Sequence, residues 1–139
     1  MARTPHPVVV VGIDGSEHSH RALVWATAHA KATDSTLRGV AAWDTPHFFG
    51  RAVPREGYEP AELAHDLVAK AVTGLDLPAD RIECRTPMGP AGEVLVEASV
   101  GAETLVIGAH GHNPVYTLLL GSTARHCLHH ASTTVVVIP

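Results

Sequence analysis

The sequence predicts an open α/β sheet, in which parallel strands are covered by helices on both faces. The chain of 139 residues suits one domain. Apolar strand-like runs alternate along it with segments of helical periodicity. The β-branched run 8–11 is uninterrupted, as in a strand buried on both faces of a parallel sheet. We therefore expect a single domain over residues 1–139, built from five strands and four helices.

The first strand is expected at residues 8–11, and the chain then turns through 12–16 into a helix. Ser16 is the candidate N-cap of that helix, and Glu17 suits the positive end of its dipole. A second strand is expected at 37–43. The apolar stripe of the first helix consists of Ala22, Leu23, Ala26 and Ala30.

Residues 44–59 combine prolines and glycines with aromatic residues, and they predict a long loop. Pro60 suits the first position of the helix that follows. The expected core stripe of this second helix is Leu63, Leu67, Ala71 and Val72.

The second half of the chain continues the alternation of strands and helices. Strands are expected at 81–86, 104–107 and 134–138. A helix at 92–100 presents Val94, Leu95 and Ala98, and the last helix, at 123–131, presents Ala124, Cys127, Leu128 and Ala131.

Charge and composition exclude several classes of partner. The net charge is −4, so the chain has no basic field for a nucleic acid. No apolar stretch is long enough to span a membrane, and the start of the chain does not resemble a signal peptide. Cys84 and Cys127 form neither a metal-binding pair nor a disulfide framework. We expect free thiols and a cytoplasmic protein.

The strongest functional signal is a glycine loop between the fourth strand and the last helix. Gly108 and Gly111 follow the strand, and Gly121 and Ser122 open the helix. Glycines let a backbone approach a ligand closely, and a helix N-terminus favours an anion such as phosphate. The alternative is that each glycine is needed only for the conformation of the backbone, without a ligand. Ser122 has two compatible expected roles, as cap of its own helix and as phosphate ligand.

Asp14 lies directly after the first strand, at the same expected edge of the sheet as Gly108. Two interpretations of Asp14 remain open. It contacts a sugar, a base or a metal that bridges to phosphate, or it stabilises its own turn. The chain has neither a Walker A loop nor the G-x-G-x-x-G pattern, which favours a mononucleotide over NAD.

Histidines are frequent near this loop, but they do not form a recognisable catalytic or metal site. His110 and His112 flank Gly111, where an imidazolium would contact phosphate. His126, His129 and His130 are interpreted as surface residues at a helix end, without a third metal ligand. Cys127 is expected to be a buried apolar residue. No catalytic residues are predicted, and the signal favours binding over catalysis.

At these residues the chain resembles the universal stress protein family. Its ATP-binding members carry G-x-x-G, nine residues and then G-S/T, and residues 108–111, 112–120 and 121–122 reproduce that pattern. The opening 10–16 and the close 126–138 are also similar to the family. The resemblance covers nearly the whole chain, and residues 44–59 match it least.

The resemblance implies a Rossmann-like, five-stranded parallel sheet in the order 3-2-1-4-5. It also implies phosphate contacts at Gly108, Gly111, Gly121 and Ser122. Adenine and ribose would lie near Asp14 and the backbone of Ala42, with Gly89 facing the nucleotide. Gly12, His110, His112 and Thr123 complete the candidate nucleotide-binding set.

The resemblance further implies an ATP-binding, nucleotide-sensing module of the stress response, with Mg²⁺ at the phosphates. The long loop 44–59 is hypothesised to fold over the base. A homodimer is also implied, and an apolar edge strand at 134–138 is a liability that pairing with a second copy would remove. The alternatives are a weak ATPase or autophosphorylating protein, with His110 as first candidate base, or an interaction module that binds AMP, cyclic AMP or no nucleotide.

Overall fold

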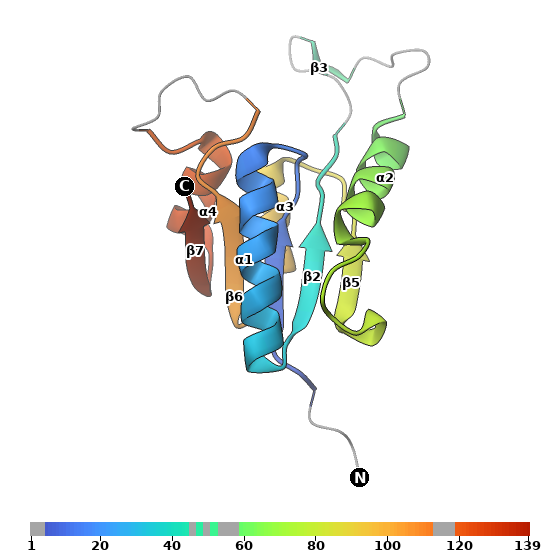
Figure 1. The fold of residues 1–139 in the computed structure, drawn as a ribbon. Helices are drawn as coiled ribbons and strands as arrows, with labels where there is room; N and C mark the ends of the chain where they lie inside the picture. Colours follow the sequence, from blue (N-terminus) through green and yellow to red (C-terminus); the bar gives the residue numbers. More distant parts are fainter. Residues whose placement is uncertain (1–4, 45–46, 49–50, 53–58, 113–118) are drawn as a thin grey trace.

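The computed structural model describes residues 5–44, 47–48, 51–52, 59–112 and 119–139. It contains a five-stranded parallel sheet in the order β5-β2-β1-β6-β7 (Figure 1). Numbered within the sheet, this is the order 3-2-1-4-5, so the expected fold class is confirmed. The strands are β1 (Val8–Gly12), β2 (Thr36–Val40), β5 (Ile82–Arg85), β6 (Thr104–Gly108) and β7 (Thr134–Ile138).

The central position of β1 follows from its pairing on both sides. Val9 lies opposite Leu37 of β2, and Val10 lies opposite Leu105 of β6. Val9, Val10 and Val11 are completely buried. An uninterrupted β-branched run is therefore what this strand requires, because both of its faces pack against helices.

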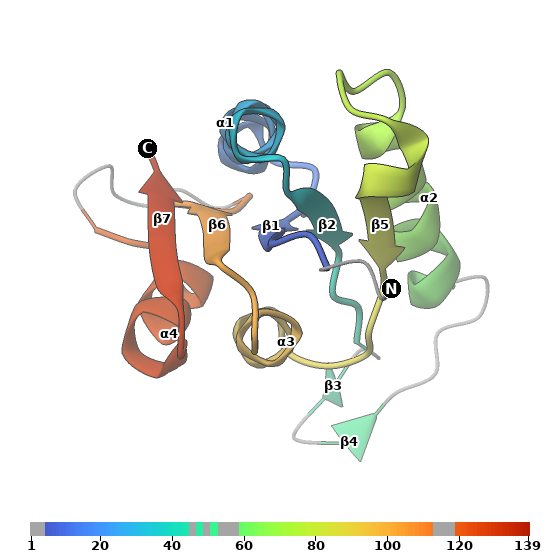
Figure 2. The same ribbon diagram turned by 90° about the horizontal axis from the view of Figure 1, so that it is seen from below.

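Two helices cover each face of the sheet. The helices α1 (Glu17–Thr33) and α2 (Pro60–Val72) lie on one face, and α3 (Ala91–Ala98) and α4 (Ser122–His130) lie on the other (Figure 2). Each face has its own apolar core. Val11 and Val68 belong to the core under α1 and α2, whereas Leu105 and Cys127 belong to the core under α3 and α4.

The second strand ends three residues earlier than expected, at Val40. Beyond it, the main chain still bonds to β5 and the segment after it, from the N–H of Ala41 to the carbonyl of Arg85 and from the N–H of Trp43 to the carbonyl of Pro87. Trp43 forms an isolated bridge with Met88, and its indole Nε1 donates a hydrogen bond of 2.8 Å to the carbonyl of Thr86. The apolar residues 41–43 that suggested a longer strand are therefore used for packing and for these contacts.

Two leucines assigned to apolar stripes are exposed, which corrects those assignments. Leu63 is 58% exposed, and the buried residues of α2 are Ala64 and Val68. Leu128 is 47% exposed, next to the buried Cys127 of α4. In both helices the buried face is therefore narrower than the apolar pattern suggests.

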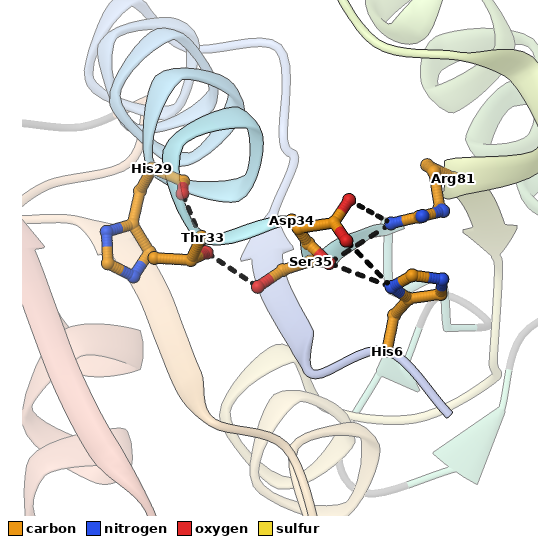
Figure 3. A network of polar contacts seen from close by, with 6 residues as sticks. All are labelled: His6, His29, Thr33, Asp34, Ser35 and Arg81. Atoms are coloured by element: carbon orange, nitrogen blue, oxygen red, sulfur yellow. Dashed lines mark hydrogen bonds and ion pairs between the residues drawn. The ribbon is translucent and has the colours of Figure 1, made fainter. Parts of the chain in front are cut away.

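A polar network lies at the amino ends of the strands, where α1 ends (Figure 3). Asp34 is the C-cap of α1 and adopts the left-handed conformation with φ of 54°. Its carboxylate accepts a hydrogen bond of 2.9 Å from Arg81, and its carbonyl lies 3.0 Å from Nδ1 of His6. Beside it, the Thr33 hydroxyl donates to the carbonyl of His29 and lies 2.6 Å from the Ser35 hydroxyl. The network joins the segment before β1, the end of α1 and the 3₁₀ turn Ala79–Arg81 before β5.

Most of the segment 44–59 lies outside the described residues, and so does the hypothesis that it covers a base. The described part includes a small antiparallel pair, β3 (His47–Phe48) and β4 (Arg51–Ala52). Within the described ranges, the structure contains no helix of the length and apolar character that crossing a membrane requires.

Candidate functional site

A cavity of about 310 Å³ opens at the carboxyl ends of β1 and β6. These two strands are neighbours, but their connections leave in opposite directions, to β2 and to β7. Such a switch point is where open parallel sheets bind ligands. Ten of the eleven candidate residues line this cavity: Gly12, Asp14, Ala42, Gly108, His110, Gly111, His112, Gly121, Ser122 and Thr123.

Asp14 stabilises its own turn and also lines the cavity. Its Oδ1 accepts a hydrogen bond of 2.8 Å from the backbone N–H of Ser16, and its own N–H donates to the hydroxyl of Ser19 at 3.2 Å. The other carboxylate oxygen, Oδ2, would lie 3.2 Å from a Cβ added at Gly111. The turn-stabilising interpretation is therefore confirmed, and Asp14 also places a negative charge beside the glycine loop.

Gly108 is required by the packing of the protein itself. A Cβ added there would lie 2.8 Å from Cβ of His18 and 2.9 Å from its carbonyl carbon, so the end of β6 and the first turn of α1 are in close contact. Gly111 is different, because its one close neighbour would be the carboxylate end of Asp14. The plain explanation thus accounts for Gly108 without a ligand.

The N-terminus of α4 faces the cavity without a side-chain cap. Gly121 is the N-cap, not Ser122, and no side chain accepts a hydrogen bond from the first turn. The N–H of Gly121 donates to the carbonyl of Ala109 at 2.8 Å, which closes the loop that begins at Gly108. Ser122 and Thr123 are the first two residues of the helix, and both line the cavity. The capping role expected for Ser122 is therefore wrong.

The side chains of His110 and His112, on either side of Gly111, make different contacts. The His110 ring meets the ring of His18 edge-on, with centroids 5.1 Å apart. His112 contacts the loop after β1 through a hydrogen bond from Nε2 to the carbonyl of Asp14. Among the described residues that line the cavity, Asp14 and these two histidines are the ionisable side chains, and none is a lysine or an arginine.

Gly89 is the candidate that does not line the cavity. Its φ of 142° favours glycine, its N–H donates to the carbonyl of Trp43 at 2.8 Å, and an added Cβ would lie 3.1 Å from Val94. These contacts explain the glycine as a turn residue between β5 and α3.

Sequence reasoning missed several lining residues, which share a position at a strand end or on the first turns of a helix. Ser19 is the polar one, and its spacing from Asp14 and Ser16 is the signal that would have found it. The complete set of missed residues is Ile13, Ser19, Val40, Ala91, Leu95, Ile107, Ala109 and Ala124.

Other reactive side chains lie away from this cavity. Cys127 is completely buried, as expected, and desolvation raises its pKa to about 11. Cys84 is exposed on β5, and partial burial raises the pKa of its thiol from the ordinary value. The rings of His126 and His130 lie 4.4 Å apart on α4. In the part of the chain that the structure describes, no three His, Cys, Asp or Glu side chains form a metal-binding group.

The fold and the cavity define the class: an α/β domain with an open parallel sheet and a strand-end cavity at its switch point. Residues 7–139 match the model of the universal stress protein family, and the chain belongs to that family. It is 32% identical over 136 residues to universal stress protein Rv2624c of Mycobacterium tuberculosis, a match that covers 94% of this chain and 47% of that protein.

Solved structures of universal stress proteins are also similar. UspA from Lactobacillus plantarum superposes with a TM-score of 0.73 at 19% identity, over 99% of this chain and all of that chain. A universal stress protein solved in complex with cAMP superposes with a TM-score of 0.61 at 28% identity, over 98% of each chain. The chain spans about half the length of the first curated relatives that it matches, such as Rv2624c.

Proposed function

We propose that this chain is an adenine-nucleotide-binding regulatory module of the universal stress protein family, with ATP as its ligand and the cytoplasm as its compartment. The observation that carries the proposal is the convergence of the glycine loop and the uncapped start of α4 on one cavity. Backbone N–H groups and the helix dipole attract phosphate there without a lysine.

The proposed ligand orientation follows from the two sides of the cavity. The phosphates lie against Gly108, Gly111, Gly121 and the first turn of α4. The Gly121 N–H is already bonded to Ala109, so the N–H groups that point at an anion are those of the first turn of α4. The nucleoside lies toward Asp14 and Ala42, at the ends of β1 and β2. Leu95 and Ile107 supply apolar surface between these ends.

Mg²⁺ fits this arrangement at one residue. A carboxylate is the oxygen ligand that Mg²⁺ prefers beside nucleotide phosphates. Asp14 places its Oδ2 beside Gly111 in the same cavity. When bound, the ion would neutralise phosphate charge that Asp14 otherwise repels.

A single cyclic phosphate is the second candidate ligand chemistry. The relative solved with cAMP is 28% identical over 98% of this chain. The negative Asp14 and the absence of lysine and arginine from the described lining residues both favour a ligand with less charge than ATP.

Two variants test the phosphate position. Thr123→Glu adds a carboxylate to the second residue of α4, where it suits the helix dipole but repels a phosphate. Ala61→Glu makes the same change at the second residue of α2, away from the cavity. Titration calorimetry with ATP, AMP and cAMP should give at least a tenfold weaker dissociation constant for Thr123→Glu and no change for Ala61→Glu.

Nucleotide retained by the purified protein provides an independent test. Mass spectrometry after denaturation should find an adenine nucleotide. Absence of retained nucleotide, together with no heat of binding for any of the three ligands, would overturn the proposal. Multiple turnovers of ATP to ADP, abolished by Gly111→Ala, would show an ATPase instead of a sensor.

We also propose that β7 pairs with β7 of a second copy. The strand is at the edge of the sheet, and four of its five residues are valine or isoleucine. An exposed apolar edge favours pairing, and antiparallel pairing of two copies closes the interface.

A further inference from the structure

The glycine loop of the cavity is hydrogen-bonded to the end of β7. The N–H of Ala109 donates to the carbonyl of Ile138 at 2.8 Å, and the carbonyl of Ala109 accepts from the N–H of Gly121 at the same distance. One residue of the loop therefore connects the edge strand to the start of α4. A ligand that fixes this loop also restrains the last residues of β7.

Side chains make a second connection between the same two places. His110 lines the cavity and meets His18 edge-on. His18 Nδ1 lies 3.4 Å from Nη2 of Arg21, and Nε of Arg21 donates to the main-chain oxygen of Pro139 at 3.0 Å. His18 and Arg21 belong to the first turns of α1 and do not line the cavity.

The orientation of the Arg21 side chain depends on its contact with the end of β7. Its Nη1 lies 3.1 Å from the carboxylate of Glu17, an exposed pair one helical turn away, which contributes little by itself. The bond to Pro139 is the one that reaches another element. A displacement of the end of β7 therefore moves the guanidinium that contacts His18.

We infer that occupation of the cavity and pairing of β7 with a second copy are thermodynamically linked, through the Ala109–Ile138 bond and the contacts His110–His18–Arg21–Pro139. The inference rests on both parts of the proposed function. A nucleotide that restrains Ala109 and His110 lowers the conformational entropy at the end of β7, so pairing of β7 then loses less entropy. Such coupling is reciprocal, so the paired protein binds nucleotide more tightly by the same factor.

His18 and Arg21 are positioning residues in this scheme, because they act on the cavity through His110. A residue with a purely structural role would change stability alone. A positioning residue changes the dependence of nucleotide affinity on self-association, and this dependence is the quantity to measure.

The test compares three proteins: the unchanged chain, Arg21→Gln and Arg85→Gln. Arg85 is on β5 at the opposite edge of the sheet, its side chain is 50% exposed against 43% for Arg21, and its substitution changes the net charge equally. Sedimentation equilibrium gives the dimer dissociation constant with and without saturating ATP, and again with cAMP. Thermal unfolding verifies that both variants are folded.

In the unchanged chain, nucleotide should tighten the dimer about fivefold or more, the lower end of common allosteric coupling. Arg21→Gln should bring this factor closer to one, whereas Arg85→Gln should leave it unchanged. A protein that binds nucleotide and dimerises with no effect of one on the other would overturn the inference but leave the proposed function intact. Absence of self-association would overturn the inference as well, and absence of nucleotide binding would overturn the proposed function first. Full coupling in Arg21→Gln would contradict the role of Arg21.

Discussion

His112 and Asp14 are joined by a hydrogen bond from the imidazole Nε2 to the main-chain carbonyl. The carbonyl accepts, so the proton is on Nε2. The bond connects the loop after β6 to the loop after β1, on two sides of the same cavity. His112 therefore connects two loops that line this cavity.

Removing this connection should speed ligand release. In His112→Ala, the dissociation rate of a fluorescent adenine nucleotide should rise about two- to tenfold, the range that one net hydrogen bond represents. The free energy of unfolding should change by no more than about 0.5 kcal/mol, because the side chain is exposed. Stopped-flow displacement measures the rate. His20→Ala, an exposed change on α1, is the control, and equal rates in both variants would contradict the role of His112.

Two glycines of the same loop should respond differently to alanine. Gly108→Ala forces a methyl group against Cβ and the main chain of His18, and the resulting overpacking should cost about 1–3 kcal/mol. Gly111→Ala meets a flexible carboxylate end and should leave stability nearly unchanged while it weakens nucleotide binding. Urea unfolding and calorimetry measure the two effects. Equal stability of the two variants would show that α1 can move away from β6.

Exposed leucines at the two sides of the molecule provide a test of pairing through β7. In α4, Leu128 lies about 200° around the helix from His126, which packs on Gly92 of α3, so it faces the β7 edge. Leu128→Glu should weaken self-association at least several-fold, whereas Leu63→Glu on α2 should not affect it. Sedimentation velocity at several concentrations measures both. A dimer that tolerates Leu128→Glu and loses stability in Leu63→Glu would place the interface at α2.

Burial of Cys127 predicts a loss of stability in alkali. Its pKa is about 11 in the folded protein and 9.0 in the unfolded chain. Between these values the folded state binds more protons, so the free energy of unfolding falls as pH rises, by at most about 1.4 kcal/mol per pH unit. The contribution is complete below pH 9. Urea unfolding at pH 8 and pH 10.5 should show a steeper decrease for the unchanged chain than for Cys127→Ala. Parallel decreases would mean that the thiol ionises equally in both states.

The left-handed conformation of Asp34 predicts which substitutions it tolerates. Asn also adopts this conformation, and the Asp34–Arg81 pair is exposed on its acidic side, so Asp34→Asn should change stability by less than about 1 kcal/mol. A β-branched side chain is strongly disfavoured at this φ, and Asp34→Val should cost about 2 kcal/mol. Thermal and urea unfolding compare the two variants. Equal losses would identify the lost charge as the cause instead of the backbone.

The fold could be predicted because its signals are local. Uninterrupted valines are typical of a strand that is buried on both faces of its sheet. Helical segments between successive strands favour a parallel sheet. The exact ends of the strands and the exposure of single side chains were harder to predict from the sequence. Leu63 and Leu128 fit an apolar pattern, yet both are exposed, and the buried residues of α2 are Ala64 and Val68. The end of β2 could not be predicted because the main-chain hydrogen bonds of Ala41 and Trp43 continue past it, so the apolar pattern also continues.

The candidate site was accessible for a topological reason. Residues directly after parallel strands meet at one edge, and this rule brought Asp14 and Gly108 together. It did not identify Ser19 or Leu95, because helices bring these residues to the cavity from the side. The rule also did not separate Gly89, whose positive φ belongs to a turn, from the glycines that line the cavity. Nor did it show that Gly121, and not Ser122, is the N-cap of α4. Ligand binding at these residues stays a prediction.

The polar network around Asp34 and the cavity lie at opposite ends of the sheet. At the amino ends, Asp34 joins three segments through its contacts with His6 and Arg81. The carboxyl ends carry the loops that line the cavity. A substitution in those loops is therefore far from the contacts that Asp34 makes with His6 and Arg81. Because the network and the cavity are separate, we expect substitutions at the cavity to change ligand binding with little effect on the contacts around Asp34.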